Sequence, residues 1–323
     1  MALHLCIKDK IIKQDIHLLA GGYRICFLGV AMNQLIQTLI SGLSLGSIYA
    51  LIALGYTMVY GIVKMLNFAH GDIIMVGAYT CIWATRSLGL SPFLGAIISI
   101  LVCSVLGIVI ESLAYRPLRQ AQPLAVLITA IGISFLLQNL ALLLFGSEQI
   151  GYPTVINIPN IIIGEIIVDG KALCTLIVTS LIMIFLHFFV NKTKIGKAMR
   201  AVSEDKDAAQ LMGIDVNKTI TITFAIGSAL AAVASIFYGS IYVFIRPNTG
   251  SMPGIKAFTA AVFGGIGSIP GAMLGGILLG IIEQVSKAYI STLMADAIVF
   301  AVLIFVLIIK PTGLLGKKNN EKV

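Results

Sequence analysis

The strongest constraint on the fold of this chain is a series of long segments that contain no charged residue. A membrane-crossing helix needs about 20 apolar residues, so most of these segments are long enough for one crossing. They lack the period-two alternation of barrel strands, which leaves an all-α polytopic membrane protein as the expected fold class. The segments are 25–63, 87–110, 120–147, 172–191, 219–245, 257–282 (with room for two shorter helices) and 297–309.

We expect about eight to nine transmembrane helices, of which the shortest are broken or re-entrant. With nine, the basic loops and the C-terminus share one side; with eight, only the N-terminus changes side. The expected helices lie near 34–62, 73–86, 93–114, 124–145, 173–190, 219–245, 257–268, 271–290 and 296–310.

Residues 1–31 differ from the rest of the chain because they are charged at first and then only patchily apolar. They lack the clean apolar core and small-residue cleavage site of a signal peptide. We interpret 1–31 as an N-terminal extension that results from a mis-called start, with Met32 as the natural start. A single permease domain is then expected at 32–316, followed by a cytoplasmic tail at 317–323.

The net charge of +8 reflects topology rather than nucleic-acid binding, because the basic residues gather in a few loops. Loop 146–171 carries three acidic residues against one lysine, so we place it outside. The basic groups that mark the inside are Arg116 with Arg119; Lys192, Lys194, Lys197, Arg200, Lys206 and Lys218; and Lys310, Lys317, Lys318 and Lys322.

Two segments, 64–72 and 261–276, interrupt apolar sequence with glycine, proline or polar residues. Non-helical backbone at membrane depth persists only where protein buries it or water fills a cavity. Paired interruptions in the two halves of a chain point to a translocation pathway and are compatible with a two-fold internal repeat. The residues we place along a possible pathway are Asn67, His70, Gly264, Gly265 and Gly267.

Segment 192–218 holds ten of the 36 charged residues and contains a short amphipathic pattern at 203–213. Ser203 is suited to cap a helix there, and Glu204, Asp205 and Asp207 suit its positive end. Ala208, Leu211 and Met212 fall on one face, and Gly213 can end the helix. Such a short helix needs a partner to be stable, and we favour a groove on a soluble subunit over the membrane surface.

The sequence carries no phosphate-binding loop, no HExxH, CxxC or GxSxG motif, and no metal-ligand spacing among its five cysteines. We therefore expect no catalytic residue, metal or cofactor in this chain. Three intramembrane sites hold ionisable groups: Glu111, which could pair with Arg116; Glu283, four residues before Lys287; and His70 with Asp72. Structural pairing is the favoured interpretation of the first two. An ion-coupled carrier is the alternative from a different class, and the lack of a carboxylate array disfavours it.

The segment Asp207–Gly213, DAAQLMG, resembles the EAA-x-x-x-G signature of the cytoplasmic loop in permeases of ATP-binding-cassette (ABC) importers, although Asp replaces Glu and the downstream I-x-L-P is missing. From Met32 onward the chain is similar to branched-chain amino-acid permeases, and more to the LivH type than to the LivM type. The matching stretches include YGIVKMLNFAHGD, YRPLR, ITAIGISFLLQN, KAFTAAVFGGIGSIPGAMLGG and KPTGLLG.

This resemblance implies a multi-pass subunit of the bacterial cytoplasmic (inner) membrane that imports leucine, isoleucine or valine. Urea, short amides and other amino acids are alternative substrates, because related permeases serve them. The implied partners are a LivM-like second permease subunit or a homologous copy, two ABC ATPase subunits that use ATP, and an extracytoplasmic binding protein. It makes 203–213 the ATPase-coupling helix, with Asp207, Ala208, Ala209 and Gly213 carried over from the signature.

Overall fold

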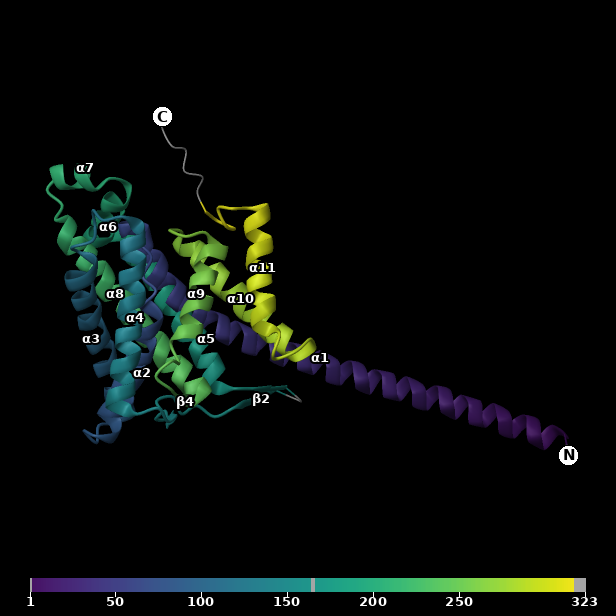
Figure 1. Ribbon diagram of the computed structural model, residues 1–323. Coiled ribbons are helices and arrows are strands. Elements are labelled where there is room, and N and C mark those ends of the chain that lie inside the picture. Colours follow the sequence, from purple (N-terminus) through teal and green to yellow (C-terminus); the bar gives the residue numbers. More distant parts are fainter. Residues whose placement is uncertain (1, 164–165, 317–323) are drawn as a thin grey trace.

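The computed structural model describes residues 2–163 and 166–316, and for 2–31, 163 and 166 it describes the backbone alone. Over this range the chain is a bundle of helices with a few very short strands, which confirms the all-α polytopic membrane fold. Figure 1 shows the bundle with the N-terminal part of α1 projecting from its side. The predicted tail at 317–323 lies outside the described residues, and the assignment of 1–31 as an extension remains a prediction.

The apolar helices, in chain order, are α1 (Ala2–Val63), α2 (His70–Arg86), α3 (Pro92–Ile110), α4 (Pro123–Phe145), α5 (Gly170–Lys192), α8 (Val216–Tyr242), α9 (Ser251–Gly264), α10 (Ile269–Tyr289) and α11 (Ala295–Ile309). The π-turn η1 (Glu111–Tyr115) extends α3, and two polar helices, α6 (Lys194–Glu204) and α7 (Lys206–Leu211), separate α5 from α8. The strands are β1 (Ile150–Gly151), β2 (Ile161–Ile163), β3 (Ile166–Val168) and β4 (Phe244–Ile245).

Six helices of the described chain are long and apolar enough to cross a membrane: α1 from Met32, α3 with η1, α4, α5, α8 and α10. The helices α2, α9 and α11 are shorter, with 17, 14 and 15 residues. The predicted helix at 257–268 was wrong in its bounds, because α9 begins six residues earlier. Its Lys256 is buried and paired with Glu283 and Asp296, so that charge does not end the helix.

The two ends of the bundle carry different elements (Figure 1). Helices α6 and α7 and the C-terminal end of α11 lie at one end, while β2 and β4 lie at the other. Arg119 donates to Asn217 at the start of α8, which brings the loop after α3 to the same end as α7. The basic loops therefore share one end, as the charge pattern predicts for the inside.

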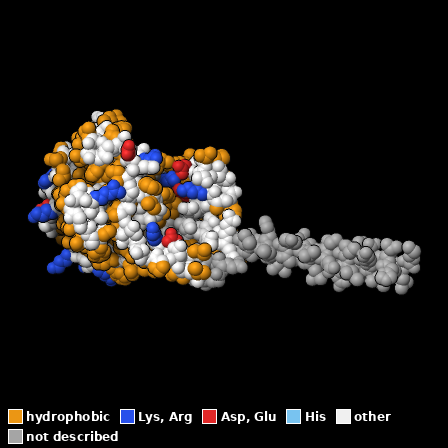
Figure 2. Space-filling model, turned by 90° about the horizontal axis from the view of Figure 1, so that it is seen from below, with side chains coloured by type: hydrophobic (Ala, Val, Ile, Leu, Met, Phe, Trp, Pro, Cys, Tyr) orange, Lys and Arg blue, Asp and Glu red, His pale blue; other side chains and the backbone are white. Residues whose placement is uncertain are grey.

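At the opposite end the loops form a thin cap. Strands β1 and β4 pair antiparallel, with Ile150 opposite Ile245, and β2 pairs with β3. The guanidinium of Arg86 donates to the carbonyl of Gly151 at 2.9 Å and ties the end of α2 to this cap. Figure 2, a view from this end, shows mainly hydrophobic and uncharged side chains with isolated charged groups between them.

Helices α1 and α8 form the centre of the bundle, while α3, α4 and α5 form its outer wall. In the apolar windows of α1 and α8, 72% and 67% of residues are buried, against 22% in α4 and 28% in α5. Glycines allow α1 to approach α10 closely: a Cβ added at Gly46 would lie 2.7 Å from the Cα of Ile277. Small residues that let backbones meet are a common way of packing membrane helices.

Candidate functional site

The polar segment between α5 and α8 forms two helices rather than the single helix predicted at 203–213. Thr193 caps α6, and Met199 and Val202 are buried where α6 packs against α1, α5 and α8. The chain leaves helical geometry at Asp205, whose backbone is extended with φ −153° and ψ 118°. The short helix α7 follows directly and points away from the bundle (Figure 1).

Asp205 caps α7, so the prediction that Ser203 would do so was wrong. The Oδ1 atom of Asp205 accepts hydrogen bonds from the backbone N–H groups of Asp207 and Ala208, at 2.9 and 3.0 Å. Ser203 belongs to the last turn of α6 and donates to the carbonyl of Arg200 instead. Aspartate is among the strongest N-cap residues, and its charge suits the positive end of a helix.

Gly213 terminates α7 just after its last helical residue, Leu211, as the sequence predicts. Its φ of +80° is in the left-handed region, which a residue with a Cβ rarely adopts. The N–H of Gly213 donates to the carbonyl of Gln210, and that of Ile214 donates to the carbonyl of Ala209. This pair of bonds is the Schellman arrangement that ends many helices.

Helix α7 turns one small residue toward the protein and its large apolar residues outward. Ala209 is only 4% exposed, whereas Leu211 and Met212 are 88% and 82% exposed. Ala208, Glu204 and Asp207 are exposed as well. Large apolar side chains this accessible on a polar, charged segment are typical of a surface that a partner covers.

The base of α7 lies among basic residues. The pKa of Lys206 is lowered mainly by burial and further by the nearby charges of Arg119 and Lys64. The carboxylate of Asp207 raises this pKa and so offsets part of the shift. Lys64 is the residue that ends α1, and its φ of 59° makes the chain turn sharply there. The base of α7, the loop after α3 and the end of α1 therefore form one basic junction.

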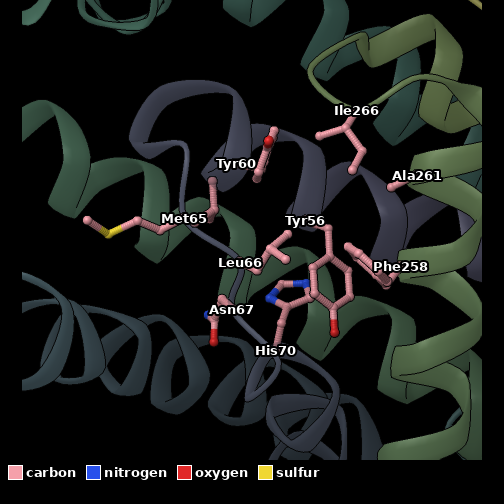
Figure 3. Close-up of a pocket in the computed structure, with 10 residues that line it drawn as sticks. Tyr56, Tyr60, Met65, Leu66, Asn67, His70, Phe258, Ala261 and Ile266 are labelled. Atoms are coloured by element: carbon pink, nitrogen blue, oxygen red, sulfur yellow. The ribbon is translucent and has the colours of Figure 1, made fainter. Parts of the chain in front are cut away.

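The two predicted interruptions meet inside the bundle. Residues 64–69 connect α1 to α2, and residues 265–268 connect α9 to α10. Together with α1 and α9 they surround a cavity of about 10 Å³, which admits at most a single water molecule. Figure 3 shows its lining: Asn67 and His70 from the first interruption, Ile266 from the second, and Tyr56 and Phe258 from the helices.

The pathway glycines named from sequence lie beside this cavity rather than in its lining. Gly267 adopts φ +90°, and its Cα would lie 3.7 Å from a Cβ added at Gly61. Gly264 packs against the backbone of Gly271, and Gly265, with φ +107°, packs against Gly316. These glycines shape the turn that brings Ile266 to the cavity.

His70 lies at the wall of the cavity and is almost fully buried, with 1% exposed. Its ring meets Tyr56 edge-on, at a centroid distance of 4.6 Å, and fits against Gly55, where any side chain would collide with it. The Nε2 atom of His70 has no hydrogen-bond partner among the described residues. A buried polar atom without a partner is uncommon in proteins, so His70 stands out among the residues that line the cavity.

On the other side of Gly71, Asp72 connects α2 to α4 and α9. Ser134 donates to one carboxylate oxygen at 2.5 Å and Gln138 donates to the other at 2.9 Å, while the Gln138 amide also lies 3.1 Å from the hydroxyl of Ser251. Gln138 also lines an open groove of about 890 Å³ at the end opposite α7, together with Glu148 and Arg246. Sequence reasoning missed these partners, although polar residues inside the apolar segment 120–147 were a signal.

The other two buried carboxylates have structural partners. Glu111 forms an ion pair with Arg119, not with Arg116 as expected, because the π-turn at 111–115 replaces the α-helical spacing on which that expectation was based. The pair of Glu283 with Lys287 is confirmed at 2.6 Å. Glu283 also accepts from Lys256 and from the hydroxyl of Tyr49, both at 2.9 Å, so it holds α1, α9 and α10 together.

Comparison with known proteins gives one consistent result. A family model described as branched-chain amino acid transport system / permease component matches residues 38–307. The chain is 45% identical over 304 residues to the high-affinity branched-chain amino acid transport system permease protein LivH of Salmonella typhimurium, covering 89% of this chain and 97% of the relative. It is 44% identical to the corresponding permease protein BraD of Pseudomonas aeruginosa, with 89% and 98% covered. A probable LivH of Methanocaldococcus jannaschii is 30% identical, with 84% and 89% covered.

Proposed function

The chain belongs to the family of branched-chain amino acid permeases, and on that premise we propose that it carries leucine, isoleucine and valine across the bacterial cytoplasmic (inner) membrane. It is a permease subunit of an ABC importer. Its proposed partners are a second permease subunit, two ATPase subunits that hydrolyse ATP, and a binding protein outside the membrane. This chain translocates the substrate and leaves ATP hydrolysis to the ATPase subunits.

The exposed tip of α7 is the observation that best supports a separate ATPase subunit bound to this chain. Leu211 and Met212 stand in solvent at the basic end of the bundle, on a helix capped by Asp205 and ended by Gly213. An apolar tip on a small, well-capped helix fits a groove on a soluble subunit. We place the ATPase subunit there, which makes α7 the coupling helix.

The cavity at the two interruptions supports a pathway inside the bundle. Its volume is about 10 Å³, far smaller than leucine, so passage of the substrate here would require the surrounding helices to move. Its lining joins the ends of α1, α2 and α9, and a change in the angles of these helices would open it. Cysteines at Asn67 and Gly267 should react with aqueous reagents in one ATP state of the importer and be protected in the other.

The coupling role is tested with two variants of α7 in the complete importer. Gly213→Pro removes the N–H that closes the helix, and Ala209→Glu places a charge where a buried methyl group packs. Each variant should reach the membrane at normal levels and abolish leucine uptake driven by ATP. Normal uptake at normal expression by either variant would exclude α7 as the coupling helix.

The assignment to an ABC importer has a simpler test. Expression of the chain alone in a strain without branched-chain amino acid transporters should give no leucine uptake. Addition of the ATPases, the second permease subunit and the binding protein should restore it. Uptake by the chain alone would favour an ion-coupled carrier.

A further inference from the structure

We propose that the π-turn η1 transmits the movement of α7 to the cavity through four side chains, Arg119, Glu111, Tyr115 and Asn67, called here the Tyr115 relay. This inference rests on the proposed function, because it assumes that α7 receives the ATPase movement. Residues of η1 and of the loop that follows it thereby have a positioning role. The links are an ion pair, side-chain hydrogen bonds and one backbone hydrogen bond, and they join the loop after η1 to the segment between α1 and α2.

The first link joins the base of α7 to the loop after η1. Arg119 lies close enough to Lys206 for its charge to act on that amine, and its guanidinium donates to Asn217 in the first turn of α8 at 2.5 Å. Only five residues, 212–216, separate the end of α7 from Asn217, so the short loop 212–215 ties α7 closely to α8. Movement of α7 therefore changes the position of Arg119.

The second link joins Arg119 to the beginning of η1. Arg119 forms an ion pair with Glu111, whose side chain is completely buried, and Thr221 donates to the second carboxylate oxygen at 2.7 Å. A buried carboxylate that loses its cationic partner is strongly destabilised, so Glu111 must follow Arg119. The ion pair joins the first residue of η1 to the loop that follows η1.

The third link is Tyr115, the last residue of η1. Its ring packs against Phe224 of α8 with a centroid distance of 5.2 Å. Its hydroxyl donates to the side-chain oxygen of Asn67 at 2.9 Å and lies 3.4 Å from the carbonyl of Leu66. Both of these residues line the cavity, so Tyr115 connects η1 directly to the first interruption.

The last link joins Asn67 to the start of α2. The backbone carbonyl of Asn67 accepts from the N–H of His70, the first residue of α2. A shift of Asn67 therefore moves His70 and the end of α2 that borders the cavity. Asn67 is 3% exposed and His70 is 1% exposed, so neither side chain is free to move independently of its neighbours.

The geometry of η1 suits this role. A π-turn carries one more residue than an α-helical turn and occurs often at functional sites. The N–H of Arg116 donates to the carbonyl of Glu111 at 2.8 Å, which is the wide-turn bond. At each end of the relay a buried nitrogen is without a partner among the described residues: Nε of Arg119 and Nε2 of His70.

The experiment uses the complete importer in proteoliposomes and measures leucine uptake and ATP hydrolysis together. Tyr115→Phe removes one hydroxyl and keeps the ring against Phe224. We expect leucine uptake to fall about fivefold, the worth of one hydrogen bond, while ATP hydrolysis stays within about twofold. The matched control is Tyr79→Phe, because the buried Tyr79 hydroxyl has no partner in the described chain, and its ratio of uptake to hydrolysis should equal that of the wild type.

A double-mutant cycle with Asn67→Ala separates the relay from a general structural effect. In the Asn67→Ala background, Tyr115→Phe should not lower the ratio of leucine uptake to ATP hydrolysis any further. Three outcomes would each overturn the relay while leaving the proposed function intact. They are independent, multiplicative losses in the double mutant, an equal fall of uptake and hydrolysis in Tyr115→Phe, and a wild-type ratio of uptake to hydrolysis in Tyr115→Phe. Absence of ATP-dependent uptake by the wild-type importer would overturn the proposed function and the relay with it.

Discussion

Replacement of Gly46 by alanine tests whether direct backbone contact between α1 and α10 sets the position of both interruptions. The added Cβ would lie 2.7 Å from the Cα and from the carbonyl oxygen of Ile277, and 3.0 Å from the carbonyl oxygen of Gly276. Carbon atoms pack best at about 3.5–4.0 Å, so the helices must separate by roughly 1 Å. The opposing atoms are all backbone, so no side chain can rotate away to relieve the contact.

The expected cost follows from comparison with Gly132. Overpacking costs about 1–3 kcal/mol, so Gly46→Ala should lower the free energy of unfolding even though alanine favours the helix. Gly132 lies in α4, where an added Cβ meets nothing within 4 Å, so Gly132→Ala should gain about 0.5–1 kcal/mol. The two single-methyl variants should therefore differ by about 2–3 kcal/mol.

The measurement is thermal unfolding of the purified chain in detergent, followed by loss of the monodisperse species after heating. A difference of about 2–3 kcal/mol corresponds to roughly 5 °C or more for a chain of this size. Equal midpoints for the two alanine variants would show that α1 and α10 can separate freely and would refute the packing argument.

Three further substitutions have expected outcomes. Glu283→Gln leaves the buried Lys256 with Asp296 alone and the half-buried Lys287 without its carboxylate, and should cost about 3 kcal/mol, measured as a lower unfolding midpoint. Asp205→Ala removes the cap of α7 and should speed hydrogen exchange across 206–212 about fivefold, as the loss of about 1 kcal/mol predicts. Gly55→Ala places a methyl group in the space of the His70 ring and should reduce leucine uptake by the complete importer without reducing insertion.

Each substitution has a matched control. Glu148→Gln changes an exposed carboxylate and should leave the midpoint unchanged; an equal drop would exclude the buried cluster as the cause. Ser203→Ala should not alter exchange in α7, and faster exchange there would restore Ser203 as the cap. Gly61→Ala meets only Gly267, at 3.7 Å, so it should transport normally, and a loss equal to that of Gly55→Ala would contradict the special role of the His70 space.

The helices and their sides could be predicted from sequence because the bilayer restricts the possible structures. Charge-free segments and basic loops identified nearly every helix and the common end of the loops. The exception was α9, whose Lys256 is neutralised by Glu283 and Asp296 from helices that follow it. A residue paired across the fold gives no local signal that its charge is compensated.

The sites were predicted only in part for the same reason. The interruptions at 64–72 and 261–276 are visible as sequence, but their meeting at one cavity depends on the packing of α1 and α9. Arg119 replaced Arg116 as the partner of Glu111 because a π-turn intervenes, and the pattern of apolar residues does not reveal one. Asp205 and Ser203 are both suitable N-cap residues. Asp205 is the cap because the chain leaves helical geometry at Asp205, and the sequence does not show where this bend occurs.

The exposed tip of α7 has a consequence for the life of the subunit before assembly. Helix α7 has six residues and few contacts with the bundle, so its local unfolding requires little free energy. In a copy without its ATPase, the unfolded segment that contains Leu211 and Met212 is therefore accessible to a protease. Docking would cover these residues and protect the same peptide bonds. We expect unassembled copies to be cut in this segment and removed, so that the supply of ATPase subunits determines how many permeases persist in the membrane.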